Sequence, residues 1–155
     1  DAIPGRENFI WLQADKVGTY TGRCAEFCGT QHARMNFIVV AHEPEDYEKW
    51  LAGEKTVPPA PTDAKALAGR STFLSLTCSQ CHAIAGTSAD RSIAPDLTHL
   101  ASRRDLAAGV IPNTPENLRR WLKDPAAFKP GCKMPDFKLT EAQLDELVAY
   151  LETLK

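Results

Sequence analysis

The chain has 155 residues, with 18 Lys and Arg against 20 Asp and Glu, which gives a net charge of −2. This balance argues against a nucleic-acid partner, because a phosphate-binding domain normally carries a basic face. No stretch approaches the roughly 20 apolar residues that a membrane-spanning helix needs, so these residues do not predict a span. The length allows one ordinary domain or two small ones.

Up to about residue 41 the apolar residues form short β-branched and aromatic runs, which predict strands over 8–13 and 35–41. Glycines punctuate the stretch between them, so the segment Cys24–Met35 is predicted to be a loop. Its cysteines, histidine and methionine are spaced four, four and three residues apart, and that spacing also fits one face of a helix. A short helix is expected over 42–50.

The residue composition changes in the middle of the chain. Residues 54–62 hold three prolines and almost nothing that could be buried, which predicts a semi-extended tether of roughly 20 to 30 Å at about 3.1 Å per residue. We therefore divide the chain into a first domain over 1–53, a Pro-rich linker over 54–62 and a second domain over 63–155.

The second domain shows helical spacing of its apolar residues. One helix is predicted from a cap at Thr62 or Asp63 to about Thr77, and another, opened by Thr114 and Pro115, over 117–123. The buried side of the first is expected to use Leu67, Phe73, Leu74 and Leu76. A capping box beginning at Thr140 opens the last helix, whose apolar stripe is Leu144, Leu147, Val148, Leu151 and Leu154.

Four soft or borderline ligands lie in the first domain: Cys24, Cys28, His32 and Met35. Thiolate and thioether ligands beside imidazole select copper or haem iron over magnesium or calcium. Two thiolates four residues apart can bridge a pair of copper ions from one loop, with His32 and Met35 at the outer positions. We call Cys24–Met35 the copper loop. A copper chaperone with a Cys-x-x-x-Cys pattern is the rival interpretation.

The second domain carries Cys78-Ser79-Gln80-Cys81-His82, the attachment sequence of a covalent c-type haem. Both thiols add to the haem vinyl groups, and the adjacent histidine is placed beneath the iron. A zinc half-site or a redox disulfide also uses Cys-x-x-Cys, but no second Cys/His pair with zinc spacing follows. The fifth cysteine, Cys132, is assigned no role.

From about residue 64 onward the chain resembles class I cytochrome c, an all-α fold. The resemblance implies that His82 is the proximal ligand of the haem iron and that Met134, just before the last helix, is the distal ligand. It also implies that the carbonyl of Pro95 accepts a hydrogen bond from the proximal imidazole.

Two further residues of this segment have more than one interpretation. Trp121 resembles the tryptophan that contacts a haem propionate in that family, and it reads equally well as a core aromatic on an amphipathic helix. His99 is expected at the surface or beside a propionate, since the resemblance already gives the iron two ligands.

The first domain resembles the binuclear copper (CuA) domain of cytochrome c oxidase subunit II. The match rests on Pro4-Gly5-Arg6, Trp11, a turn at Gly18-Thr19-Tyr20 and the whole copper loop. It implies that Cys24 and Cys28 bridge the coppers, that His32 and Met35 are terminal ligands and that Glu26 offers its backbone carbonyl. The corresponding position in nitrous oxide reductase is typically tryptophan.

The same centre needs a second histidine from an upstream strand, and residues 1–23 contain none. Residues 1–53 are also too few for a whole cupredoxin barrel of about seven strands of five to six residues each. We expect them to form the C-terminal portion of a cupredoxin-like barrel, in a longer subunit that also has a first β portion and an N-terminal membrane hairpin.

A copper domain followed by a cytochrome c resembles subunit II of caa-type haem-copper oxidases. The implied function is electron transfer in aerobic respiration, from haem c to the copper pair and on to the oxygen-reducing subunit I, with no catalytic residue in this chain. Implied partners are subunits I and III, an upstream quinol-oxidising complex or small electron carrier, and the membrane, at the periplasmic face of a bacterial cytoplasmic membrane. The alternative is a soluble haem c electron shuttle with a non-functional copper-loop appendage.

Overall fold

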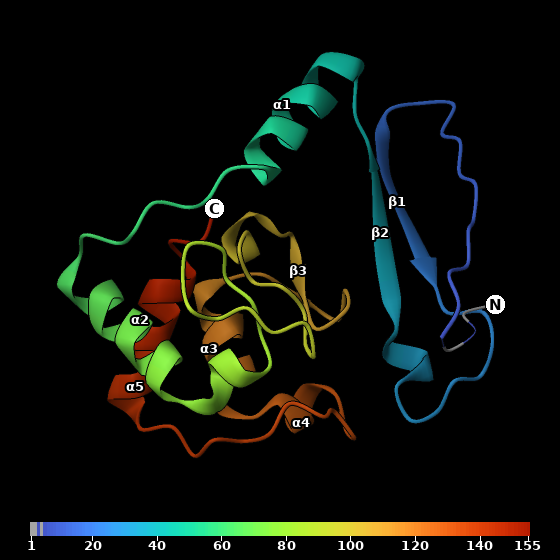
Figure 1. Cartoon of the computed structure of the whole chain (residues 1–155). Helices are drawn as coiled ribbons and strands as arrows, with labels where there is room; N and C mark the ends of the chain where they lie inside the picture. The colour runs from blue at the N-terminus through green and yellow to red at the C-terminus, as the bar shows by residue number, and fades with distance from the viewer. Residues whose placement is uncertain (1–2, 4) are drawn as a thin grey trace.

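The structure, a computed structural model, describes residue 3 and residues 5–155. We refer to residues 3 and 5–53 as the N-terminal part and to residues 63–155 as the C-terminal part. Figure 1 shows a long hairpin standing beside a helical body, with one helix and an extended linker joining the two. Pro4, which belongs to one of the motifs above, lies outside the described residues.

The N-terminal part is built on a two-stranded antiparallel sheet. Strand β1 (Gly18–Arg23) pairs with β2 (Asn36–Ala41) in a register that runs from Gly18 opposite Ala41 to Arg23 opposite Asn36. A 3₁₀ turn, η1 (His32–Arg34), lies in the loop between them, and helix α1 (Pro44–Glu54) follows β2. The predicted loop and the strand ending at Ala41 are confirmed, and the helix begins two residues later and ends four later than expected.

Two predictions for this part are wrong. Residues 8–13 form no strand, because a strand needs a hydrogen-bonded partner and this segment has none among the described residues. Gly18-Thr19-Tyr20 is the start of β1 instead of a turn. The described strands make two separate two-stranded sheets, so a cupredoxin barrel is not shown.

The C-terminal part contains helices α2 (Ala64–Ser75), α3 (Pro115–Lys123), α4 (Pro125–Phe128) and α5 (Glu141–Leu151). Between α2 and α3 lie the 3₁₀ turns η2 (Thr77–Gln80) and η3 (Leu100–Ser102), and a small hairpin of β3 (Asp105–Leu106) and β4 (Ile111–Pro112). The helix starts follow the predicted caps: Asp63 accepts from the Ala66 amide, and Thr140 and Gln143 form the capping box.

The core of the C-terminal part lies where α2 crosses α5. A Cβ on Gly69 would sit 1.9 Å from the carbonyl oxygen of Glu146, so the two helices approach this closely only because position 69 has no side chain. Leu67 was predicted to be buried, and this prediction is wrong because the residue is 45% exposed. The fully buried side chains of this core include Phe73, Ile84, Leu144, Leu147 and Tyr150.

None of the helices among the described residues combines the length and the apolar character that crossing a bilayer would require.

Candidate copper and haem sites

The β1–β2 register brings the two ends of the copper loop together. The ladder continues for one more step past the strands, with the Cys24 amide donating to the Met35 carbonyl at 3.0 Å. Cys24 and Met35, the first and last predicted ligands, therefore lie opposite each other at the end of the hairpin. The His32 amide donates to the Gly29 carbonyl at 3.0 Å, which turns the middle of the loop back toward them.

All five groups that were expected to bind copper converge in this loop. Cys28 Sγ lies 3.6 Å from Cys24 Sγ, 3.8 Å from His32 Nδ1 and 3.9 Å from Met35 Sδ. Cys24 Sγ lies 3.1 Å from the carbonyl oxygen of Glu26. The ligand atoms of Cys24, Cys28 and His32 all lie within 4.8 Å of one another, which is the crowding expected around metal ions.

The two thiols lie close enough to affect each other's ionisation. The hydrogen bond with Cys24 raises the pKa of the Cys28 thiol above its usual value. Two neighbouring thiols resist a double negative charge, and a bound cation reverses that preference by deprotonating its ligands. Both cysteines are free of disulfides. The donor set, soft sulfur with one imidazole, suits copper.

In the C-terminal part the attachment sequence lies on η2 and the turn after it. The amides of Cys81 and His82 donate to the Cys78 carbonyl at 3.1 and 3.0 Å, which places His82 just beyond the two cysteines. Burial raises the pKa of the Cys78 thiol.

A second segment holds the imidazole of His82 in place. The Ala94 amide donates to the Cys81 carbonyl at 2.9 Å, and His82 Nδ1 lies 2.6 Å from the carbonyl oxygen of Pro95, the contact that the resemblance implied. A carbonyl can only accept, so Nδ1 carries the proton and Nε2 keeps a free lone pair. This is the tautomer that a metal-binding histidine needs.

Met134 and Cys78 pack against the same core cluster, so the predicted distal ligand and one attachment cysteine belong to one packed unit. Trp121 is half-buried on α3, between the buried Leu118 and Leu122, and its proposed propionate contact stays a prediction. Of the two positions expected for His99, the surface is wrong: only 9% of it is exposed, and its Nε2 lies 3.1 Å from the Glu54 carbonyl. A place beside a propionate stays a prediction.

The profile of the cytochrome c family matches residues 66–155, which is more than half of the chain. The chain belongs to the cytochrome c family. Residues 1–42 match a second profile, the periplasmic domain of cytochrome c oxidase subunit II. The two matches fall on the two sites described above, and they confirm the resemblance to a subunit II fused to a cytochrome c.

Curated relatives match the whole chain, across both parts. The chain is 38% identical over 156 residues to cytochrome c oxidase subunit 2 of Alkalihalophilus pseudofirmus, 35% over 167 residues to that of Bacillus sp. strain PS3 and 33% over 165 residues to that of Bacillus subtilis. Each match covers 100% of this chain and 45%, 46% and 46% of the relative. The chain thus spans about half the length of these relatives.

Proposed function

We propose that this chain is part of subunit II of a caa-type haem-copper oxidase and relays electrons in aerobic respiration. The observation that carries the proposal is that one chain holds two sites with soft ligands. Each site lies in a segment that matches a family of redox proteins. A covalent haem c and a binuclear copper centre, when bound, supply one-electron redox chemistry. The direction implied is from haem to copper and on to subunit I.

Each site residue has a role in this proposal. Cys78 and Cys81 would hold the haem covalently, His82, oriented by Pro95, and Met134 would bind its iron, and Trp121 would contact a propionate. A methionine ligand favours reduced iron and a high potential. Cys24 and Cys28 would supply the thiolates that the copper ions share, and His32, Met35 and the Glu26 carbonyl would supply the remaining donors from this chain.

The division of the chain follows the same proposal. Residues 1–53 are the C-terminal portion of a cupredoxin-like domain, 54–62 the linker and 63–155 the cytochrome domain. In the parent subunit an upstream segment supplies the second histidine, the remaining strands and the membrane hairpin. A tether of about ten residues keeps the donor site at an effective concentration near the millimolar range, so transfer need not wait for diffusion.

The wider assembly is also proposed. Subunits I and III are the partners at the periplasmic face of a bacterial membrane, and an upstream quinol-oxidising complex or small carrier is the electron source. The second candidate, a soluble haem c shuttle, is favoured by one observation: no residue of the described N-terminal part is buried, so this part has no core of its own.

The test is a rapid-kinetics measurement on the parent oxidase. Haem c is reduced by a light pulse, and the haem and copper absorptions are followed in time. We expect haem reoxidation to accompany copper reduction. Cys28→Ser should leave the first reduction intact and abolish the second step. Reoxidation of haem that proceeds equally in this variant would favour the shuttle.

A further inference from the structure

Two loops of the C-terminal part contact the copper loop at both ends of its His32–Met35 segment. On one side of that segment, the side chain of Gln31 donates from Nε2 to the Pro130 carbonyl. On the other side, the Asn36 amide donates to the Ala108 carbonyl at 3.2 Å, and Asn36 Nδ2 donates to the Gly109 carbonyl at 3.4 Å. The residues that flank the predicted copper ligands are therefore both hydrogen bonded to the other part of the chain.

The turn that receives Asn36 is strained. Ala107, Ala108 and Gly109 have φ values of 57°, 62° and 72°, three consecutive residues in the left-handed region. For a residue with a Cβ this conformation is sterically unfavourable. Such strain persists only where the surroundings enforce it, and it concentrates at functional positions.

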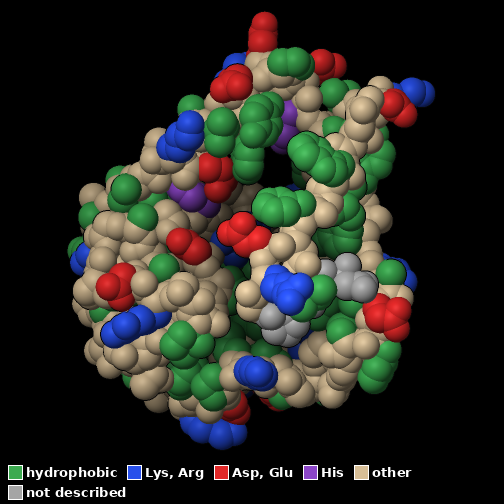
Figure 2. Space-filling model, turned by 45° about the vertical axis from the view of Figure 1, so that its right-hand side comes forward, with side chains coloured by type: hydrophobic (Ala, Val, Ile, Leu, Met, Phe, Trp, Pro, Cys, Tyr) green, Lys and Arg blue, Asp and Glu red, His purple; other side chains and the backbone are tan. Residues whose placement is uncertain are grey.

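The strained turn is closed by a hydrogen bond of its own and contacts Asn36 through two carbonyls. It joins β3 to β4, and the Val110 amide closes it by donating to the Leu106 carbonyl at 3.1 Å. The carbonyls of Ala108 and Gly109 both reach Asn36, one its backbone and the other its side chain. A cleft of about 460 Å³ opens beside this contact, between β2, α1 and the turn, and Figure 2 shows the hollow at the junction of the two parts.

The second contact, between the copper loop and the loop around Gly131, is close-packed. Gly131 has a φ of 80°, and a Cβ at this position would lie 3.2 Å from Thr30 Cγ2 and 3.5 Å from Thr30 Cβ. The Oε1 atom of Gln31 is buried here without a hydrogen-bond partner, which shows that its side chain is enclosed. Gly131 precedes Met134 by three residues, so this contact joins the copper loop to the segment that carries the predicted iron ligand.

We propose that the turn 107–109 and the loop 129–131 form an intramolecular docking surface for the copper loop. Gln31 and Asn36 are its positioning residues. Gln31 fixes one end of the His32–Met35 segment against the loop that leads to Met134, and Asn36 fixes the other end against the turn 107–109. A more exposed hydrogen bond, from Arg104 to Thr19 Oγ1 at 2.9 Å, lies on the edge of the same surface. The positioning role rests on the proposed function, whereas the docking itself does not.

A disulfide tests the docking directly. Thr30→Cys with Gly131→Cys, in a Cys132→Ser background, places two Cβ atoms about 3.5 Å apart, within the range that a disulfide accepts. In the haem-loaded chain this pair should oxidise to a cross-linked form that migrates faster on a non-reducing gel. The control, Glu45→Cys with Gly131→Cys, puts one cysteine at the start of α1, beyond the opposite end of β2, and should stay reduced. Equal cross-linking of both pairs, or of neither, would overturn the docking.

A second variant covers the case in which a side chain at position 131 disturbs the loop. Asn36→Ala keeps the backbone bond to Ala108 and removes the side-chain bond to Gly109. Loss of one hydrogen bond should speed hydrogen exchange of the residue 36 amide about fivefold in the haem-loaded chain. The control Asn8→Ala, whose side chain bonds to the Arg6 carbonyl within its own segment, should leave that amide unchanged. An unchanged rate in Asn36→Ala would overturn the role of Asn36.

The positioning role is tested in the parent oxidase with the cross-linked pair. Electron transfer from haem to copper should persist in the cross-linked form. If transfer is lost in that form and returns after the disulfide is reduced, the positioning role is overturned and the docking still holds. If transfer fails in the unmodified oxidase, the proposed function fails instead. The gel and the exchange rate depend on neither copper nor turnover, so the two failures are distinguishable.

Discussion

The two parts of this chain hold their ligands by different means. In the C-terminal part, Met134 and Cys78 pack on a core whose centre, Leu144 and Leu147, is 0% and 1% exposed. In the N-terminal part the ligands converge through local hydrogen bonds on an exposed loop, and Cys28 itself is exposed. Hairpin register and local hydrogen bonds can therefore bring a set of predicted ligands together, but a packed core is what makes such a set rigid.

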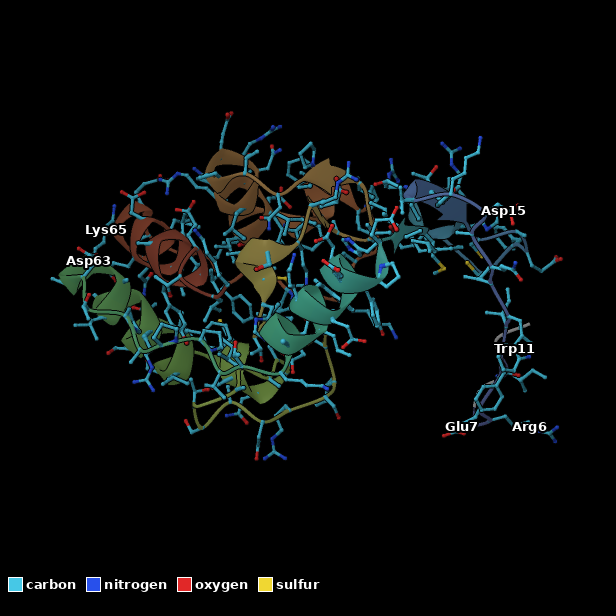
Figure 3. The ribbon with its side chains drawn as sticks, turned by 90° about the horizontal axis from the view of Figure 1, so that it is seen from above. Arg6, Glu7, Trp11, Asp15, Asp63 and Lys65 are labelled. Atoms are coloured by element: carbon cyan, nitrogen blue, oxygen red, sulfur yellow. The ribbon has the colours of Figure 1, made fainter. Side chains whose placement is uncertain are left out.

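The apolar residues of the N-terminal part show the same contrast. Trp11 is 94% exposed and Phe27 is 78% exposed. Figure 3 shows Trp11 on a segment that extends away from the rest of the molecule, with Arg6 and Glu7 farther along the same segment. Large aromatic side chains normally provide much of the buried area of a core or an interface. Among the described residues of the N-terminal part, these aromatic side chains have no core to bury them.

Copper loading gives the largest expected difference between the parts. The 155-residue chain should carry haem but no stable copper pair, because the ligand loop lacks a rigid shell and the second histidine. The parent subunit should carry both, and Cys24→Ser there should abolish the copper absorption and leave the haem spectrum unchanged. Metal analysis with visible spectroscopy is the measurement. Two coppers per chain in the short form would show that the loop is sufficient alone.

The two methionines of the chain provide a matched pair of substitutions. Met134→Ala should leave the haem attached, lower its potential by at least about 0.1 V, part of the roughly 0.8 V that axial ligands span, and allow carbon monoxide to bind the ferrous form. Met35→Ala should leave both properties unchanged. Redox titration and carbon monoxide difference spectra are the measurements, and the assignment of Met134 is wrong if the two variants behave alike.

Substituting one helical glycine in each part compares how tightly the helices of the two parts are packed. Gly69→Ala should destabilise the chain by about 3 kcal/mol, because the new Cβ meets the Glu146 carbonyl where α2 crosses α5. Gly53→Ala, in α1, should be neutral or stabilising by up to about 1 kcal/mol, because its Cβ meets nothing within 4 Å. Denaturant unfolding of both variants is the measurement. Similar losses would mean that α1 is packed as tightly as α2.

The smallest predicted effect is a loss of stability at acid pH. A hydrogen bond from Lys123 holds the pKa of Glu141 below its ordinary value of 4.5, and Arg119 adds to the effect. The stabilisation is therefore complete above about pH 4.5 and is lost as the pH falls through the lowered pKa. Both Glu141→Gln and Lys123→Gln should reduce the free energy of unfolding near neutral pH, and the difference from the unchanged chain should shrink in acid.

The double variant is the control for this ion pair. Because Glu141 and Lys123 share one interaction, their combined effect should be smaller than the sum of the two single effects. Unfolding curves measured at several pH values decide the point. A difference that is constant down to strongly acid pH would show that the pair contributes nothing through its charge.

Sequence patterns predicted the helices of the C-terminal part because their signals are local. Caps at Asp63, Thr114 and Thr140 are read within three residues, and the structure uses all three. The strand predicted over 8–13 failed because a strand is defined by its partner, which no local pattern provides. Leu67 has the right residue type but lies on the exposed side of α2, since the crossing with α5 decides which side is buried.

By itself the sequence determined the chemistry of both sites, because Cys-x-x-Cys-His and the cysteine, histidine and methionine spacing of the copper loop fix the donor atoms and their order along the chain. Only the tertiary structure decided how the sites meet. The strained turn at Ala108, its contact with Asn36 and the close approach of Gly131 to Thr30 join residues far apart in sequence. The reason is physical: a ligand's donor atom belongs to the residue, whereas a docking contact is made by backbone carbonyls and a missing Cβ, whose positions depend on the folding of the whole chain.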